Sequence, residues 1–135
     1  MSIEELYPGR EASRQMTANL EIIRAIAEVS GDHNPIHFSD AAARAAGFQG
    51  VIAHALFCEG LISAVIAGDL PGPGSIILSQ EICCLKPVYL GDTVTATITI
   101  RHIDMSKGFV DAEILCVNQV AVPVMKGTVR LLLRE

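Results

Sequence analysis

The stretch "AHALFCEGLISAVIAGDL" (residues 53–70) is the longest apolar run of this chain and decides its fold. One stripe of apolar and small residues recurs at helical spacing: Ala53, Leu56, Phe57, Gly60, Leu61, Ala64 and Val65. Because most other positions of the run are apolar too, we predict a helix that is buried nearly all round. His54, Glu59 and Ser63 interrupt the run, whereas a membrane span needs about 20 mostly uncharged residues. The breaker "GDLPGPG" ends the helix.

The chain after this helix is rich in β-forming residues. "DTVTATITI" alternates apolar residues with threonines, as a half-buried strand does. Turn signals at 91–92, 106–108 and 118–123 separate the predicted β-rich segments, which cover residues 75–90, 92–104, 108–120 and 122–134. Four consecutive strands joined by short turns favour an antiparallel sheet.

Helical patterns dominate the chain before residue 53. Residues 11–16 are compatible with a short strand, and Thr17 is a candidate N-cap for a helix that ends at Gly31. A short alanine-rich helix follows near residues 40–47. The order predicts an α+β fold, in which one buried helix packs against an antiparallel sheet. One edge of such a sheet would stay open, and we expect a second copy of the chain to extend it.

Composition limits the class of protein. The 135 residues fit one domain spanning 1–135, and with 50% hydrophobic and 19% charged residues we expect surplus apolar surface that a homo-oligomer would bury. The net charge of −5 argues against nucleic-acid binding, which needs a basic patch. "MSIEELYPGR" lacks the pattern of a signal peptide, so we expect a cytoplasmic protein that does not enter membranes. The four cysteines, Cys58, Cys83, Cys84 and Cys116, are interpreted as reduced and buried.

The loop "SGDHNPIH" (residues 30–37) carries the residues best suited to chemistry. Pro35 prevents a continued helix, so His33 and His37 are not a helical metal-binding pair, and we expect no metal. The stiff loop could instead hold Asp32 and His37 in one arrangement, in which a carboxylate and an imidazole handle one water molecule. From the pattern alone, a helix-ending turn whose polar groups satisfy the backbone is the favoured interpretation, and the catalytic one is the alternative.

The start of the long helix offers a second kind of group. Its first turn has free N–H groups and a partial positive charge, so the Ala55 N–H could stabilise a developing oxyanion. The side chain of His54 is interpreted as a capping or packing group, and Ser63 as bonded to its own helix. Glu59 has no firm role.

Four ordered blocks, "SGDHNPIH", "GVIAHALF", "LPGPGSIIL" and "LKPVYLGDTV", make the chain resemble the MaoC-like (R)-specific enoyl-CoA hydratase family. The resemblance implies a hot-dog fold, with sheets joined edge to edge in a dimer and the active site near the interface. It places the catalytic pair on Asp32 and His37, with Asn34 and Ser63 in support. The implied reaction is hydration of a trans-2-enoyl-CoA to an (R)-3-hydroxyacyl-CoA, or its reverse, without a cofactor. Ala55 departs from the glycine common in the family.

Two other functions stay open. Proteins with the hot-dog fold also include acyl-CoA thioesterases and acyl-carrier-protein dehydratases. A non-catalytic subunit that binds acyl-CoA is the third interpretation, and Ala55 and Glu59 are the residues that favour it. The acyl chain length and the residues that contact CoA are not assigned by the sequence.

Overall fold

The computed structural model describes residues 1–134. Five strands, three α-helices and two short 3-10 helices follow one another along this part of the chain. Their order is η1 (Ile3–Glu5), β1 (Glu11–Thr17), α1 (Leu20–Ser30), η2 (Pro35–His37), α2 (Asp40–Ala45), α3 (Ala55–Gly68), β2 (Ser75–Cys84), β3 (Thr93–Asp104), β4 (Phe109–Val117) and β5 (Pro123–Leu133). The predicted order of helices before four strands is confirmed. The short strand predicted near the N-terminus is also present, as β1 at the edge of the sheet.

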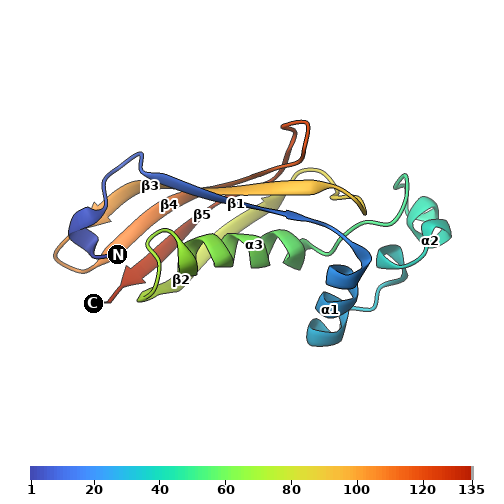
Figure 1. Cartoon of the computed structure of the whole chain (residues 1–135), viewed down its shortest axis with the longest axis horizontal. Helices are drawn as coiled ribbons and strands as arrows, with labels where there is room; N and C mark the ends of the chain where they lie inside the picture. Colours follow the sequence, from blue (N-terminus) through green and yellow to red (C-terminus); the bar gives the residue numbers. More distant parts are fainter. Residues whose placement is uncertain (135) are drawn as a thin grey trace.

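The strands form one antiparallel sheet in the order β1-β3-β4-β5-β2. The long helix α3 lies along one face of this sheet, and α1 and α2 gather at the end where α3 begins (Figure 1). Both termini lie at the opposite end (Figure 1). The predicted α+β architecture, a sheet around one central helix, is therefore confirmed.

The core lies between α3 and the sheet. Alternate residues of β3 are fully buried and face α3: Val94, Ala96, Ile98 and Ile100. The buried side of α3 meets them with Phe57, Leu61, Ile62 and Val65. This alternation with a period of two is the pattern that the threonine-rich segment predicted. Among residues 1–134, no helix is long and apolar enough to cross a bilayer.

The prediction that α3 is buried nearly all round is wrong for the single chain. The helix buries six residues, while Leu56, Gly60, Ser63 and Ala67 form an exposed face. These four positions recur at helical spacing and lie on the side away from the core. The apolar character of this face is not explained by packing within one chain.

The boundaries of α1 differ from the prediction at one end. Thr17 is the last residue of β1, where its hydroxyl contacts that of Thr93 across the strand pair at 2.8 Å. The N-cap is Asn19, whose side chain accepts a hydrogen bond from the N–H of Ile22 at 2.8 Å. Gly31 ends the helix as predicted, with a φ of 80° that glycine adopts without strain.

The cysteines divide into two pairs. Cys58 and Cys116 are buried as predicted, but Cys83 and Cys84 on the edge strand β2 are exposed, so that part of the prediction is wrong. All four are free thiols, as expected. The error arises because β2 lies at the edge of the sheet and α3 packs mainly on β3 and β1, so both faces of β2 stay exposed.

Candidate active site

The loop after α1 is held in shape by short side-chain turns. The hydroxyl of Ser30 accepts the N–H of Asp32 at 3.1 Å, and the Asp32 carboxylate accepts the N–H of Asn34 at 3.1 Å. Asn34 then caps η2 by accepting the N–H of Ile36 at 3.3 Å, with Pro35 at the first helical position. The backbone-satisfying turn and the stiff presentation of Asp32 are therefore both present in the same loop.

This loop brings Asp32 and His37 together. Nε2 of His37 lies 3.7 Å from Oδ2 of Asp32. His37 is 5% exposed, whereas the side chain of Asp32 is 46% exposed. The carbonyl of Ile52 accepts a 2.7 Å hydrogen bond from Nδ1 of His37. Because a carbonyl only accepts, Nδ1 carries a proton and Nε2 is the atom presented to Asp32.

His54 is the member of the site that sequence reasoning missed. It occupies the N-cap position of α3, but its side chain makes no capping bond. Its ring instead stacks on His37, with centroids 3.7 Å apart and planes inclined by 26°. Its Nε2 donates to the backbone carbonyl of Asp32 at 2.9 Å. The predicted packing role holds, and the predicted capping role is wrong. The sequence offered one indication, a histidine within a stretch predicted to be buried. This pattern does not show which residue the histidine contacts.

The buried ring of His54 carries an unsatisfied nitrogen. His54 is 3% exposed, and its Nδ1 has no hydrogen-bond partner within residues 1–134. A buried polar group without a partner costs about 1–3 kcal/mol. A leucine of similar volume would avoid that cost, so packing alone does not account for histidine here.

Asp32, His37 and His54 each offer one potential ligand atom, and these atoms lie within 4.8 Å of one another. Three protein ligands are the number found in catalytic zinc sites. The ring nitrogens that already donate to Ile52 and Asp32 carbonyls are not free for a metal. The absence of a metal remains a prediction, while His33, exposed on the loop, lies outside this group.

An apolar pocket of about 350 Å³ opens beside the two histidines. It is lined by His37, His54 and Ala55 together with Cys58, Lys86 and a mostly apolar wall: Phe48, Ile52, Ala53, Cys84, Leu85, Pro87, Val88, Val124 and Met125. Such a pocket suits the acyl part of a ligand, with few polar groups to orient it.

The two cysteines of this pocket are poor nucleophiles. The hydrogen bond with Cys116 and burial together raise the pKa of the Cys58 thiol. Although Cys84 as a residue is exposed, partial desolvation of its thiol at the pocket wall is the main cause that raises its pKa. Since the thiolate is the reactive form, neither residue suits covalent catalysis.

Of the other predicted site residues, some lie beside the pocket next to Asp32 and His37 and some do not. Ala55 begins α3 and lines the pocket, which places the free N–H groups of the first helical turn beside it. Ser63 lies two turns further along on the exposed face and is not among the pocket-lining residues. Glu59 is half-buried. Within one chain, His37 and Ala55 therefore line the same pocket, Asp32 contacts His37, and Ser63 is not part of this group.

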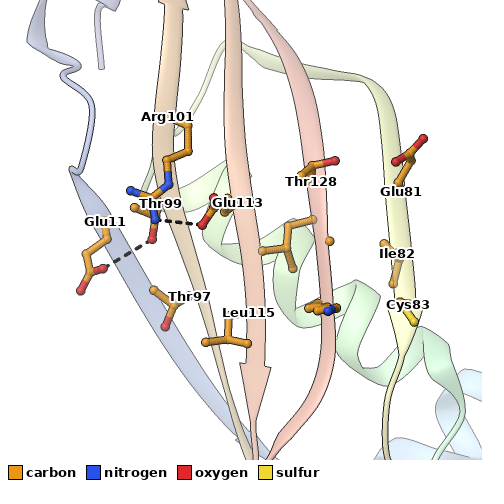
Figure 2. Close-up of a pocket in the computed structure, with 13 residues that line it drawn as sticks. Glu11, Glu81, Ile82, Cys83, Thr97, Thr99, Arg101, Glu113, Leu115 and Thr128 are labelled. Carbon is orange, nitrogen blue, oxygen red and sulfur yellow. Dashed lines mark hydrogen bonds and ion pairs between the residues drawn. The ribbon is translucent and has the colours of Figure 1, made fainter.

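A larger groove of about 780 Å³ lies on the other face of the sheet. Figure 2 shows it with α3 behind the strands, and its labelled side chains come from all five strands. Arg101 donates to Glu113 at 2.8 Å, and the hydroxyl of Thr99 donates to Glu11 at 3.4 Å (Figure 2). None of Asp32, His37, His54 and Ala55 lines this groove. Of the acid–base pair, His37 lines the smaller pocket, and Asp32 lies next to it through its contact with His37.

The family model described as "MaoC like domain" matches residues 6–119. The (R)-specific enoyl-CoA hydratase of Rhodospirillum rubrum is 38% identical over 113 residues, which are 84% of this chain and 78% of that protein. The 3-hydroxybutyryl-CoA dehydratase of Methylorubrum extorquens is 43% identical over 100 residues, which are 74% of this chain and 64% of that protein.

Solved structures show the same similarity. The (R)-hydratase from A. caviae involved in PHA biosynthesis superimposes with a TM-score of 0.92 at 27% identity, over 97% of this chain and 99% of that chain. R-hydratase PhaJ1 from Pseudomonas aeruginosa superimposes with a TM-score of 0.91 at 33% identity, over 98% of this chain and 85% of that chain. The predicted resemblance is therefore confirmed across nearly the whole chain.

Proposed function

The chain belongs to the family of MaoC-like domains, and from that premise we propose that it is an (R)-specific enoyl-CoA hydratase of the hot-dog fold. It would add water across the double bond of a trans-2-enoyl-CoA to give an (R)-3-hydroxyacyl-CoA, and catalyse the reverse dehydration. The observation that carries the proposal is the pair of Asp32 and His37, 3.7 Å apart at the edge of an apolar pocket.

The pair suits the handling of one water molecule. A water can lie about 2.8 Å from both Oδ2 of Asp32 and Nε2 of His37. As the water oxygen forms its bond to C3 of the substrate, one side chain takes a proton from it, and C2 receives a proton in turn. Burial of the His37 ring and its bond to Ile52 hold Nε2 in position for this step.

Negative charge develops on the thioester oxygen during the addition. The first turn of α3 supplies backbone N–H groups beside the pocket, and we assign the Ala55 N–H as the donor to this oxygen. Asn34 supports the pair through its cap on η2. We keep Ser63 as a supporting residue only for the assembled protein, because it is remote from the pocket within one chain.

We propose that the chain, as a single domain, forms a cytoplasmic homodimer. Two apolar surfaces support the dimer. The edge strand β2 exposes Ile76, Ile77 and Leu78 by 40–47%, and an apolar groove of about 340 Å³ lies between α1 and Leu56 of α3. This groove begins beside the loop that carries Asp32, so a second copy would cover the half-exposed carboxylate.

The test uses purified protein with crotonyl-CoA. The proposal predicts loss of the ultraviolet absorbance of the enoyl thioester, formation of (R)-3-hydroxybutyryl-CoA on chiral analysis, and no release of free thiol. Release of CoA without hydration would establish a thioesterase. Binding without turnover would establish a binding subunit, and either result would overturn the proposal. Parallel reactions with enoyl-acyl-carrier protein distinguish the two carriers.

A further inference from the structure

His54 contacts both members of the proposed catalytic pair and carries one buried polar atom that packing does not explain. Its ring lies 3.7 Å from the ring of His37. Its Nε2 donates to the backbone carbonyl of Asp32 at 2.9 Å. Its Nδ1 is buried and unpaired in the described part of the chain. One side chain thus touches both members of the pair through separate atoms.

The backbone that carries His54 is itself fixed. The N–H of Ala53 donates to the carbonyl of Val88 at 2.8 Å, and Ile52 forms a bridge with Tyr89. The Ile52 carbonyl in the same short segment accepts the hydrogen bond from Nδ1–H of His37. The Ile52 N–H also donates to the carbonyl of Ile36 at 3.2 Å. The segment 52–54 therefore makes three hydrogen bonds to the catalytic loop, at Asp32, Ile36 and His37.

The loop itself has mostly local support. The turns at Asp32 and Asn34 join residues two apart in the chain, so they fix the shape of the loop but not its place on the rest of the fold. The bond from His54 joins residues 22 positions apart and ties the loop to the start of α3. This bond holds the backbone of Asp32, while the bonds of Ile52 hold Ile36 and His37. It therefore supports the half-exposed Asp32 at a point where its carboxylate accepts, within residues 1–134, only the local hydrogen bond from Asn34.

We infer that His54 is a positioning residue of the proposed hydration: its ring fixes the plane of His37, and its Nε2–H fixes the Asp32 loop. The inference rests on the proposed function. His54 would act through the other two residues and would not itself exchange a proton with the substrate. Its ring also forms part of the pocket wall, but its bonds are to the catalytic pair. It would therefore affect the rate of the chemical step more than substrate binding.

Three substitutions separate the parts of this role. His54→Leu removes both the donor and the aromatic ring. His54→Gln keeps a donor at the position of Nε2 without the ring. His54→Asn is too short to place a donor there. His33→Gln is the matched control, because His33 is exposed on the same loop and lies outside the cluster.

In the leucine and asparagine variants we expect kcat to fall by about a hundredfold, the loss typical of reacting groups misplaced by about 1 Å. KM should stay within about threefold, since a positioning residue alters the chemical step rather than ground-state binding. The glutamine variant should regain about tenfold over the asparagine variant, because it restores the bond to the Asp32 carbonyl. His33→Gln should keep kcat within about twofold of the wild type, as surface substitutions do.

Three outcomes would overturn the inference: His54→Leu with kcat within about twofold of the wild type, glutamine no better than asparagine, or a loss carried by KM. Thermal unfolding shows which variants are folded at the assay temperature. If leucine and asparagine prevent folding, the glutamine variant decides, and a kcat more than about a hundredfold below wild type overturns the inference.

An activity-independent measurement separates this inference from the proposed function. In nitrogen-15 spectra of the wild type, the Nδ1–H of His37 bonded to Ile52 should give a resolved signal that exchanges slowly with water. In His54→Leu this signal should broaden or vanish, and in His33→Gln it should persist. An unchanged signal in the leucine variant overturns the positioning role even if the wild type proves inactive on enoyl thioesters.

Discussion

Asp32 and His37 contribute to the site by opposite physical means at the scale of single residues. His37 is buried and its Nδ1–H is bonded to a backbone carbonyl, so the orientation of its ring and of Nε2 is fixed. Asp32 is half-exposed and depends on neighbours for its position. A rigid acid–base group beside a carboxylate on a supported loop provides two proton acceptors that one water can reach.

The cap supplied by Asn34 leads to a prediction at this scale. Asn34→Ala leaves the N–H of Ile36 without its acceptor, and loss of such a cap costs about 0.5–2 kcal/mol. Because η2 carries His37, kcat on crotonyl-CoA should fall about tenfold along with the small loss of stability. Steady-state kinetics and chemical unfolding measure the two effects.

Ser39→Ala provides the control for the cap. Ser39 caps α2 by accepting the N–H of Ala42 at 3.1 Å, so the same kind of bond is removed outside the catalytic pair. It should lower stability by a similar amount and leave kcat within about twofold. Equal losses of kcat in both variants would show that Asn34 acts through stability alone.

Sequence reasoning located Asp32 and His37 but assigned His54 to packing or capping for a physical reason. Pro35 and the Asp-Asn turn chemistry are local features, and local features can be read from neighbouring residues. The bond from His54 to the Asp32 carbonyl joins residues 22 apart, and stacking on His37 depends on how two loops meet. No spacing rule within one element reports such a contact.

At the scale of elements, α3 both packs against the sheet and supplies backbone N–H groups to the pocket. One side packs on β3, and its N-terminus faces the pocket with free N–H groups. The position and length of α3 were predictable because apolar residues persist over four turns. Its exposed face was not, because apolar content alone does not show which neighbour covers a residue.

The residue at the start of α3 gives the prediction for this scale. Ala55→Gly removes a methyl group next to the N–H that we assign to the thioester oxygen, and glycine lets a ligand approach the backbone more closely. We expect kcat/KM for crotonyl-CoA to rise about threefold, while stability falls by up to about 1 kcal/mol. The comparison is made by steady-state kinetics and urea unfolding.

Ala67→Gly is the control for the helix. It makes the same exchange on the exposed face near the other end of α3. It should reduce stability by a similar amount without raising kcat/KM. If Ala55→Gly lowers kcat/KM, the methyl group supports the site rather than crowding it. That result would contradict the claim that the thioester oxygen approaches the Ala55 N–H.

The whole molecule leaves two kinds of surface unexplained by one chain. β2 is paired only with β5 and exposes large apolar residues, and α3 exposes a face that reaches from Leu56 to Ala67. The surplus of apolar residues in the sequence predicted such a surface but not its place. Only the strand order shows which strand is left at the edge.

Dimer formation is the prediction at this scale. Light scattering should give twice the mass of one chain for the wild type. Leu78→Lys places a charge on the open edge, where lysine discourages strand pairing, and should shift the mass to that of one chain. Because the second copy would cover the loop with Asp32, kcat should fall in the same variant.

Val120→Lys is the control for the edge. Val120 is 70% exposed in the turn between β4 and β5 and is not part of β2. It should leave both the mass and kcat of the wild type. A wild-type protein with the mass of one chain and full hydratase activity would contradict the proposal that the active protein is a dimer.

The central claim is that Asp32 and His37 together hydrate the enoyl thioester, and the most direct measurement is kcat for crotonyl-CoA in Asp32→Asn and His37→Gln. Both substitutions keep size and hydrogen-bonding capacity but remove proton exchange. Each should lower kcat by about a thousandfold or more, with crotonyl-CoA still bound and His33→Gln unaffected. A folded Asp32→Asn or His37→Gln variant that retains a tenth or more of the wild-type kcat would contradict the account.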